Sequence, residues 1–254
     1  MQDSISTALE NEYKVARDQH LERVANQRGI SYLTENFSKF TSRQSLTRFL
    51  AHDEIFRKIL DIHGSVIECG VYLGQSLMTW AQLSSIYEPI GGATREIFGF
   101  DTFTGFPSVS EFDLVPNLPD HKIGDLDTSN VVGQSVYSDL INEIALFDKN
   151  RFLPQFHKVS LIKGDFINTC EDFLQENAHV IPALLYLDFD LYEPTALALK
   201  NFLPRMPKGS IIAFDELNVR DWPGETKALL ESLNINNYIL RKTAYDIKIS
   251  YIEL

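Results

Sequence analysis

The sequence has few cysteines and no long apolar run. Its 254 residues include only two cysteines, Cys69 and Cys170. Two cysteines are too few for a disulfide framework, which fits the reducing cytoplasm. Their spacing is also not that of metal ligands. No segment approaches the roughly 18 apolar residues that a membrane-spanning helix needs. Residues 1–14 are polar and acidic, unlike a secretion signal, so we expect a cytoplasmic protein.

Basic residues are also scarce relative to acidic ones. The chain has 23 Lys and Arg against 35 Asp and Glu, which gives a formal net charge of −12. This balance disfavours nucleic acids and anionic membranes as partners, because both are themselves negatively charged. Hydrophobic residues, in contrast, make up 44% of the chain. This content is ample for the core of one large α/β domain, alone or with an arm.

Short apolar segments alternate with helix-like segments through most of the chain. We expect strands at 65–69, 96–101, 158–163, 183–188 and 210–214, and helices at 74–86, 136–147, 166–176, 193–202 and 224–233. This alternation predicts a doubly wound, mostly parallel sheet that is covered on both faces. Two closing segments, 238–242 and 248–252, predict an antiparallel hairpin at the edge of the sheet.

Two stretches lie outside this alternation. Residues 1–36 form a polar, charged arm that we expect to be helical in part, and a further helix begins at Thr41-Ser42. We therefore divide the chain into a helical arm, 1–62, and a main domain, 63–254. Residues 102–136 lack periodicity and are rich in proline and glycine, which indicates a lid or a disordered loop. Of the histidines, only His121, inside this stretch, is a candidate for a functional role.

The turn after the first predicted strand is typical of a nucleotide-cofactor site. Gly70 and Gly74 allow the backbone to approach a ligand closely, and the helix that follows directs free N–H groups at it. The spacing is not the G-x-G-x-x-G of a dinucleotide site. Glu68, just before the first glycine, suits a ligand with a cationic amino-acid end, and S-adenosylmethionine is the leading candidate. An ordinary strand-to-helix turn is the alternative.

Every one of the five predicted parallel strands ends in an acid. These acids are Glu68, Asp101, Asp165, Asp188 with Asp190, and Asp215 with Glu216. Because ligands of such sheets bind beyond the carboxyl ends of the strands, the acids are expected to surround one site. Asp101 suits the two ribose hydroxyls of an adenosine, and Asp165 suits the adenine amino group. Taken singly, each acid could instead be a loop residue or a helix cap.

The acids after the fourth and fifth strands are expected to converge. Several carboxylates close together repel one another unless a cation or a proton intervenes. Oxygen ligands favour Mg²⁺, Ca²⁺ or Mn²⁺, and such a metal could bind two substrate hydroxyls and lower the pKa of one. A nearby carboxylate would take the proton, and the alkoxide would attack a sulfonium methyl group. The alternative is a salt-bridged or helix-capping cluster without a metal.

The order and spacing of four motifs resemble the macrocin O-methyltransferase family. The motifs lie at residues 67–74, 99–107, 188–195 and 208–216. The resemblance extends over about residues 64–230. Within the family, the sequence is most similar to dTDP-6-deoxy-L-hexose 3-O-methyltransferases. The resemblance implies a class I, Rossmann-like methyltransferase that moves a methyl group from S-adenosylmethionine to a sugar hydroxyl. The sugar is a deoxysugar, nucleotide-linked or part of a glycoside. The family also implies that the N-terminal helices help to close the site and to build homo-oligomers.

The resemblance also assigns roles to residues. It implies a divalent metal, usually Mg²⁺, held by Asp188, Asp215 and Glu216, with Asp190 as the general base. The candidate cofactor contacts are Glu68, Gly70, Tyr72, Gly74, Ser76, Asp101, Thr102, Asp165 and Asp188. Two positions depart from the family pattern: Phe189 stands where glycine is frequent, and Glu216 where aspartate is frequent.

Two other functions stay open at this point. The Asp188-x-Asp190 motif is also similar to the metal-binding D-x-D of glycosyltransferases that use nucleotide sugars, although the Glu68–Gly74 turn has no role there. A non-catalytic S-adenosylmethionine-binding module is the third possibility. The segment 222–226, which reads Trp-Pro-Gly-Glu-Thr, is expected to shape the wall of the cleft and to start a helix.

Overall fold

The structure is a computed structural model that describes residues 8–90, 94–131 and 133–254. It divides into two compact units, residues 1–49 and 50–254, and each is described by itself. The first unit contains α1 (Ala8–Arg28), α2 (Ile30–Glu35), α3 (Phe37–Phe40) and the beginning of α4 (Arg43–Lys58). The predicted arm is therefore helical. The predicted cap of α4 is also present, because the Ser42 Oγ accepts the N–H of Ser45 at 3.1 Å.

The described residues of the second unit form one seven-stranded sheet. Its strands are β1 (Ser65–Cys69), β2 (Ile97–Asp101), β3 (Val159–Lys163), β4 (Pro182–Leu187), β5 (Ile211–Phe214), β6 (Arg241–Lys242) and β7 (Ser250–Glu253). They lie in the order β3-β2-β1-β4-β5-β7-β6, with β1 to β5 parallel and β7 antiparallel to both β5 and β6. The strand order reverses between β1 and β4, which is where open α/β sheets bind their ligands.

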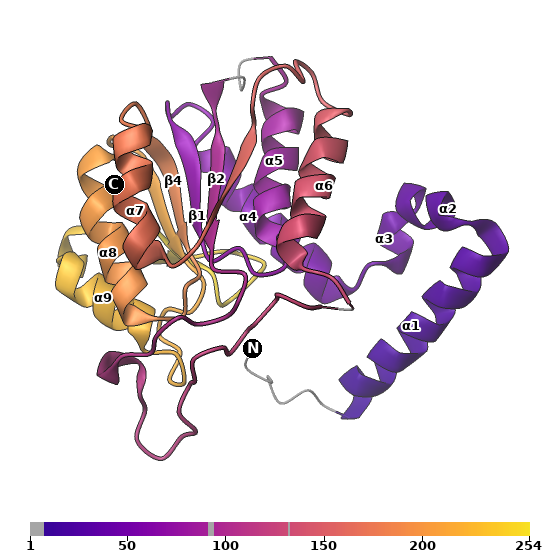
Figure 1. Ribbon diagram of the computed structural model, residues 1–254, viewed down its shortest axis with the longest axis horizontal. Coiled ribbons are helices and arrows are strands. Elements are labelled where there is room, and N and C mark those ends of the chain that lie inside the picture. The colour runs from indigo at the N-terminus through magenta and orange to yellow at the C-terminus, as the bar shows by residue number, and fades with distance from the viewer. Residues whose placement is uncertain (1–7, 91–93, 132) are drawn as a thin grey trace. The chain divides into compact units, whose positions relative to one another are not determined.

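Helices cover both faces of this sheet (Figure 1). The helices α5 (Gln75–Tyr87) and α6 (Val136–Asp148), with the second half of α4, lie on one face. On the other face lie α7 (Phe166–Glu176), α8 (Tyr192–Phe202) and α9 (Gly224–Ser232). Side chains of the central strands alternate between two cores: Leu184 and Tyr186 of β4 belong to the first, and Leu185 and Leu187 to the second. This two-sided burial explains why β4 is almost entirely apolar.

The observed elements confirm most of the predicted bounds, and α7 matches its prediction at both ends. Short 3-10 turns add Glu111–Asp113, Leu203–Arg205 and Ile235–Asn237. The main correction concerns the first hairpin strand, predicted over 238–242 but reduced to the two residues of β6. The side chain of Asn234 accepts the N–H of Asn236 at 3.2 Å in a turn that ends at Asn237, and residues 238–240 after it are not in a strand. The turn predicted at Gly91-Gly92 lies outside the described residues.

The long insertion, residues 102–136, is folded against the starts of α8 and α9. The buried Asp113 carboxylate accepts the N–H of Tyr192, the first residue of α8, at 2.7 Å. Phe106 exchanges backbone hydrogen bonds with Asp125 and Gly124, at 3.0 and 2.9 Å, so the two arms of the insertion are paired. Of the two predicted alternatives, a lid and a disordered loop, these contacts support an ordered cover for the end of the sheet.

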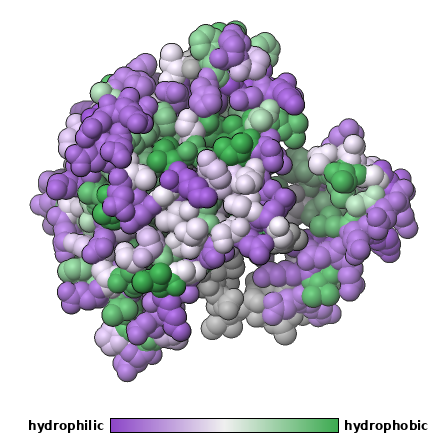
Figure 2. Space-filling model, in the orientation of Figure 1, coloured by the Kyte–Doolittle hydropathy of each residue, from purple (hydrophilic) through white to green (hydrophobic). Residues whose placement is uncertain are grey.

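The surface agrees with the charged composition. On the face drawn in Figure 2, hydrophilic side chains cover most of the molecule and hydrophobic residues form separate patches. Among the described helices, none combines the length and the apolar character needed to cross a membrane. Cys69 and Cys170 are both buried with free thiols, so Cys69 acts as a small core residue, as predicted.

Candidate active site

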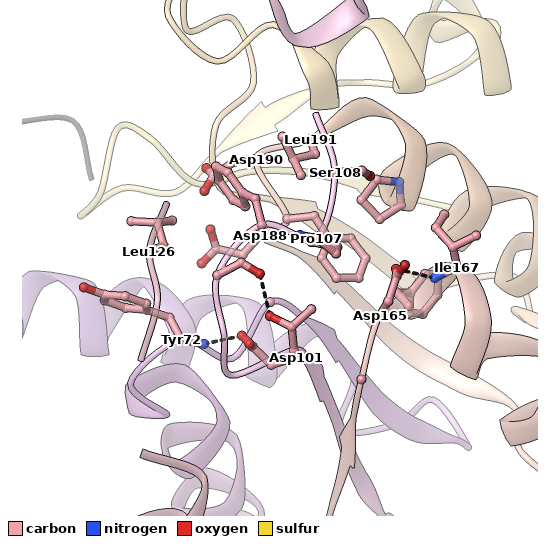
Figure 3. Close-up of a pocket in the computed structure, with 18 residues that line it drawn as sticks. Tyr72, Asp101, Pro107, Ser108, Leu126, Asp165, Ile167, Asp188, Asp190 and Leu191 are labelled. Carbon is pink, nitrogen blue, oxygen red and sulfur yellow. Dashed lines mark hydrogen bonds between the residues drawn. The ribbon is translucent and has the colours of Figure 1, made fainter. Parts of the chain in front are cut away.

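A cavity that is partly open to solvent lies at the carboxyl ends of β1 to β4. The loops that follow these four strands, together with the insertion, form its walls (Figure 3). Six of the nine predicted cofactor contacts line it, and so does Asp190: the six are Gly70, Tyr72, Asp101, Thr102, Asp165 and Asp188. The topology therefore brings together residues that lie more than 100 positions apart in the sequence.

Gly70 fixes the contact between the β1 loop and the β4 loop. Its φ is 96°, and a Cβ at this position would lie 2.0 Å from the carbonyl oxygen of Asp188. No other residue fits there without moving one of the loops. The second glycine of the motif, Gly74, has a φ of 83° and caps α5, but it does not line the cavity.

The carboxylate of Asp101 shapes the same loop. Its Oδ2 accepts the N–H groups of Val71 at 2.9 Å and Tyr72 at 2.8 Å, and its Oδ1 accepts the N–H of Phe103 at 2.6 Å. Burial raises the pKa of Asp101 above its ordinary value, while the three N–H donors act in the opposite direction. Oδ1 retains a lone pair, so the predicted contact with ribose is compatible with this holding role.

Asp165 lies across the cavity from Asp188 and Asp190 (Figure 3). It is the N-cap of α7. Its Oδ1 accepts the backbone N–H of Ile167 at 3.0 Å, and its Oδ2 accepts an N–H of the Asn168 side-chain amide at 3.1 Å. The capping alternative weighed for this acid is therefore present in the structure. The neighbouring apolar side chains in the wall suit a flat ring: Pro107, Phe166, Ile167 and Pro194.

Glu68 and Ser76 lie beneath the glycine turn and do not line the cavity. Glu68 is fully buried, and its Oε1 accepts the Ser76 hydroxyl at 2.8 Å. This bond ties the end of β1 to the first turn of α5. In the structure both residues support the turn, and their direct contact with the cofactor stays a prediction.

Asp188 and Asp190 carry their carboxylates on the same side of the cavity, toward Tyr72 and Leu126 (Figure 3). Asp190 has a φ of 63°, a left-handed conformation that is uncommon for aspartate. Burial, followed by the charges of Glu216 and Asp215, raises the pKa of Asp190 to about 7. The predicted convergence of the acids after β4 and β5 is therefore present, and it leaves Asp190 able to accept a proton near neutral pH.

Glu225 is a buried acid beside this group to which the sequence analysis gave no role. It lies in the first turn of α9 with none of its surface exposed. Its Oε1 accepts the N–H of Asp190 at 3.3 Å, and its Oε2 accepts the N–H of Glu216 at 3.2 Å. Burial raises its pKa well above the ordinary value, and the charges of Asp190 and Asp215 act in the same direction. The one feature of the sequence that could have indicated Glu225 is its position directly after Pro-Gly at the start of a helix.

Tyr186 and Lys248 bind the two acids after β5. The Tyr186 hydroxyl donates to Asp215 Oδ1 at 2.9 Å, and His52 Nε2 lies 3.4 Å from the same hydroxyl. Lys248 Nζ donates to Glu216 Oε1 at 2.6 Å. Tyr186 lies within an apolar strand and Lys248 within a predicted hairpin strand, so neither position gave a functional signal in the sequence.

The aromatic residues of the insertion support the cavity wall from behind. Trp222 is buried against Phe106 and Leu191, which line the cavity. His121 stacks on Trp222 with ring centroids 3.8 Å apart, and its Nε2 lies 2.9 Å from the carbonyl oxygen of Asp221. The expected role of the 222–226 segment in the wall agrees with this packing, and His121 is explained by it.

The predicted metal centre does not find support in this geometry. Among the described residues, no three carboxylate, imidazole or thiolate groups come together as a metal site. Glu216 is already bound by an ammonium group and Asp215 by a hydroxyl. The residues present therefore do not fit a divalent ion in this arrangement, and the metal-binding role of Asp188, Asp215 and Glu216 stays a prediction.

The strand order, the cavity at the carboxyl ends and the acids around it define a class I methyltransferase fold. The family model described as Macrocin-O-methyltransferase (TylF) matches residues 10–233, and the chain belongs to this family. The crystal structure of CalS11, described as a calicheamicin methyltransferase, is 33% identical with a TM-score of 0.85, and the match covers 97% of this chain and 93% of that one.

Two further comparisons agree. The apo structure of CalS11, described as a TDP-rhamnose 3'-O-methyltransferase, is 30% identical with a TM-score of 0.77, and the match covers 97% of this chain and 95% of that one. A curated relative from Streptomyces olivaceus, 8-demethyl-8-(2,3-dimethoxy-alpha-L-rhamnosyl)-tetracenomycin-C 4'-O-methyltransferase, is 26% identical over 159 residues. That match covers 61% of this chain and 53% of the relative, so the chain matches about half of the relative's length. Together these findings confirm the predicted family and fold, and they favour methyl transfer over the glycosyltransferase alternative.

Proposed function

We propose that the protein is an S-adenosylmethionine-dependent O-methyltransferase that acts on a sugar hydroxyl. The observation that carries this proposal is the position of Asp190 in the wall of the cavity that Gly70, Asp101 and Asp165 also line. A group able to take a proton and the candidate cofactor contacts thus share one space. The names of the relatives support a rhamnose-type deoxysugar, linked to a nucleotide in CalS11 and part of a glycoside in the Streptomyces olivaceus protein.

The cavity suits the cofactor in chemistry. Asp101 would face the ribose hydroxyls, and the apolar wall beside Asp165 would take the adenine ring. When bound, S-adenosylmethionine supplies a methyl group that its cationic sulfur makes reactive. The rest of the chemistry falls to the side chains of this chain.

Asp190 is the proposed general base. It accepts the proton of the sugar hydroxyl as the hydroxyl oxygen forms its bond to the methyl carbon. The bond between that carbon and sulfur breaks at the same time, and its electron pair stays on sulfur. The products are a methyl ether and S-adenosylhomocysteine, and the proton passes from Asp190 to solvent. A carboxyl group whose pKa lies at about 7 is well matched to this task, because about half of it is ionised at neutral pH and it is more basic than an ordinary aspartate.

Binding of S-adenosylhomocysteine, measured by isothermal titration with and without Mg²⁺, tests the cofactor assignment. Methyl transfer is then followed by mass spectrometry with a TDP-deoxysugar and with a rhamnosyl glycoside as acceptors. We expect binding and a product heavier by one methyl group. Absence of binding in both conditions would overturn the proposal and return the glycosyltransferase hypothesis to first place.

Mg²⁺ is not part of this mechanism, because Lys248 binds one of the three predicted ligands. Measuring turnover in the presence of EDTA tests whether the reaction needs Mg²⁺. Full activity in EDTA is the expected result. Loss of activity in EDTA that Mg²⁺ restores would show instead that Asp188, Asp215 and Glu216 rearrange to hold a metal, as the family resemblance implies.

We also propose that the helical arm, residues 1–62, builds a homo-oligomer, as the family resemblance implies. Light scattering on the full chain and on a chain that begins at residue 50 would test it. An oligomer that persists without the arm would contradict this part of the proposal.

A further inference from the structure

One buried carboxylate connects the two loops that carry the acid group. Asp190 and Glu216 follow β4 and β5, which are neighbouring parallel strands paired from Leu184↔Ile211 to Leu187↔Phe214. Glu225, from α9, accepts one backbone N–H from each loop, at 3.3 and 3.2 Å. Its two oxygens therefore join two strand ends that are separate in the sequence.

The burial of Glu225 indicates that these bonds matter. None of its surface is exposed, and a carboxylate in such a place carries a large desolvation cost unless hydrogen bonds offset it. A residue that only filled space here would be apolar. Glu225 accepts hydrogen bonds from the N–H groups of the two loops, which would otherwise be buried without an acceptor.

The backbone around Asp190 needs such support. A left-handed φ of 63° is unfavourable for a residue with a Cβ and persists only where its surroundings impose it. The start of α9 packs directly on this loop: a Cβ at Gly224 would lie 2.5 Å from Tyr192 N and 2.8 Å from the Asp190 carbonyl oxygen. Gly224 therefore permits the close approach, and Glu225 supplies the hydrogen bonds.

We propose that Glu225 is a positioning residue for methyl transfer: it holds the backbones of Asp190 and Glu216 so that the Asp190 carboxylate faces the cavity. Glu225 does not itself line the cavity, so it acts through Asp190 and not on the substrate. The assignment rests on the proposed function, in which Asp190 is the base.

The Glu225→Gln variant tests the proposal with almost no change in volume. An amide has one oxygen, so one of the two N–H groups loses its acceptor whichever way the amide is oriented. We expect kcat to fall about tenfold or more, because one of the two loop N–H groups loses its buried acceptor. The KM for the cofactor and the affinity for S-adenosylhomocysteine should stay within about threefold, because the candidate cofactor contacts other than Asp188 lie on other loops. Glu231→Gln, the same change at an exposed position of the same helix, should leave all of these values unchanged.

A double variant separates positioning from general support. If Glu225 acts through Asp190, then adding Glu225→Gln to Asp190→Asn should reduce the residual rate by less than about twofold. A full tenfold further loss would mean that Glu225 does not act through Asp190 and would overturn the proposal. Equal losses of kcat, cofactor affinity and thermal stability in Glu225→Gln would overturn it as well, since they indicate a purely structural residue.

Hydrogen exchange gives a readout that does not depend on any acceptor. In Glu225→Gln, the amides of Asp190 and Glu216 should exchange faster, while the rest of α9 keeps its protection. Unchanged exchange at both amides would overturn the proposal even if the variant were slow. A wild-type protein that methylates no sugar would refute the proposed function, whereas an active wild type with an equally active Glu225→Gln would refute only the role of Glu225.

Discussion

The two halves of the site use the same kind of residue in opposite ways. After β2 and β3, the carboxylates of Asp101 and Asp165 accept N–H groups from nearby backbone, and these bonds hold the loops in place. After β4 and β5, the carboxylates lie beside one another, and burial together with like charge raises the pKa of Asp190. The first half therefore shapes a binding surface, and the second half retains a group that can take up a proton. The position of an acid after a strand is thus not enough to assign its role.

Among the variants proposed here, Asp190→Asn should have the largest effect on the rate. An asparagine cannot accept the hydroxyl proton, and a positioned general base contributes roughly 100- to 10,000-fold to a rate. We expect kcat to fall by at least about 100-fold while S-adenosylhomocysteine binds as tightly as before. Titration calorimetry and steady-state kinetics check both parts. Full turnover in this variant would show that another group serves as the base.

Asp101→Asn should affect the other half. Two of its three N–H partners bind Oδ2 and one binds Oδ1, so an asparagine with a single acceptor oxygen cannot serve all of them. We expect the affinity for S-adenosylhomocysteine to fall about 10- to 100-fold, which corresponds to one or two hydrogen bonds to a charged group. The rate at saturating cofactor should change by less than this.

Asp165→Asn gives a comparison within the same half of the site and is not a neutral control, because Asp165 is itself a candidate cofactor contact. Asparagine caps a helix about as well as aspartate, so this variant should leave thermal stability nearly unchanged. An unchanged affinity in Asp101→Asn would show that Asp101 has no special place in the loop.

Tyr186→Phe should produce a smaller change in the acid half. It removes the hydroxyl that donates to Asp215 at 2.9 Å, and we expect kcat to fall about three- to tenfold through poorer orientation of that carboxylate. Tyr87→Phe removes a similar bond, to Asp53 at 2.7 Å, beside the residues that precede β1. Tyr87→Phe should lower the free energy of unfolding about as much as Tyr186→Phe does, and it should leave kcat unchanged. Equal kinetic effects of the two changes would argue against a role for Tyr186 in the site.

The last prediction concerns stability and its dependence on pH, and not the rate. Because the pKa of Asp190 is raised to about 7 in the folded protein from 3.8, the folded state binds a proton more readily than the unfolded state between these values. The free energy of unfolding therefore falls, through this group, as the pH rises from about 4 to 7. Asp190→Asn should be more stable than the wild type above pH 7, and the difference should shrink below pH 4. Chemical denaturation at several pH values measures it, and a constant difference would contradict the raised pKa.

The sequence predicted the sheet, its strand ends and the acids that follow them, because periodicity and strand-end position are local properties. It also predicted that Asp188 and Asp190 would meet Asp215 and Glu216, since neighbouring strands end at one edge. It did not predict the partners that arrive from elsewhere. Tyr186 and Lys248 are placed by strand packing, and nothing in their immediate sequence indicates a role at the site. The sequence signal for Glu225 was only its position after Pro-Gly at the start of a helix. A glycine motif gives the position of a turn but not the direction of each side chain, so direct contact of Glu68 and Ser76 with the cofactor stays a prediction.

Gly70 has a consequence for how closely such a site is built. Its missing side chain lets the backbone of the cofactor loop rest on the backbone of the loop that carries the base, with no atom between them. A reaction that moves a single carbon atom between two bound molecules tolerates very little variation in the distance that separates them. Here that distance depends on main-chain contact across two adjacent strands of a rigid sheet, which thermal motion of side chains cannot lengthen. The distance between the cofactor loop and the proposed base is therefore set by the main chain and not by side chains.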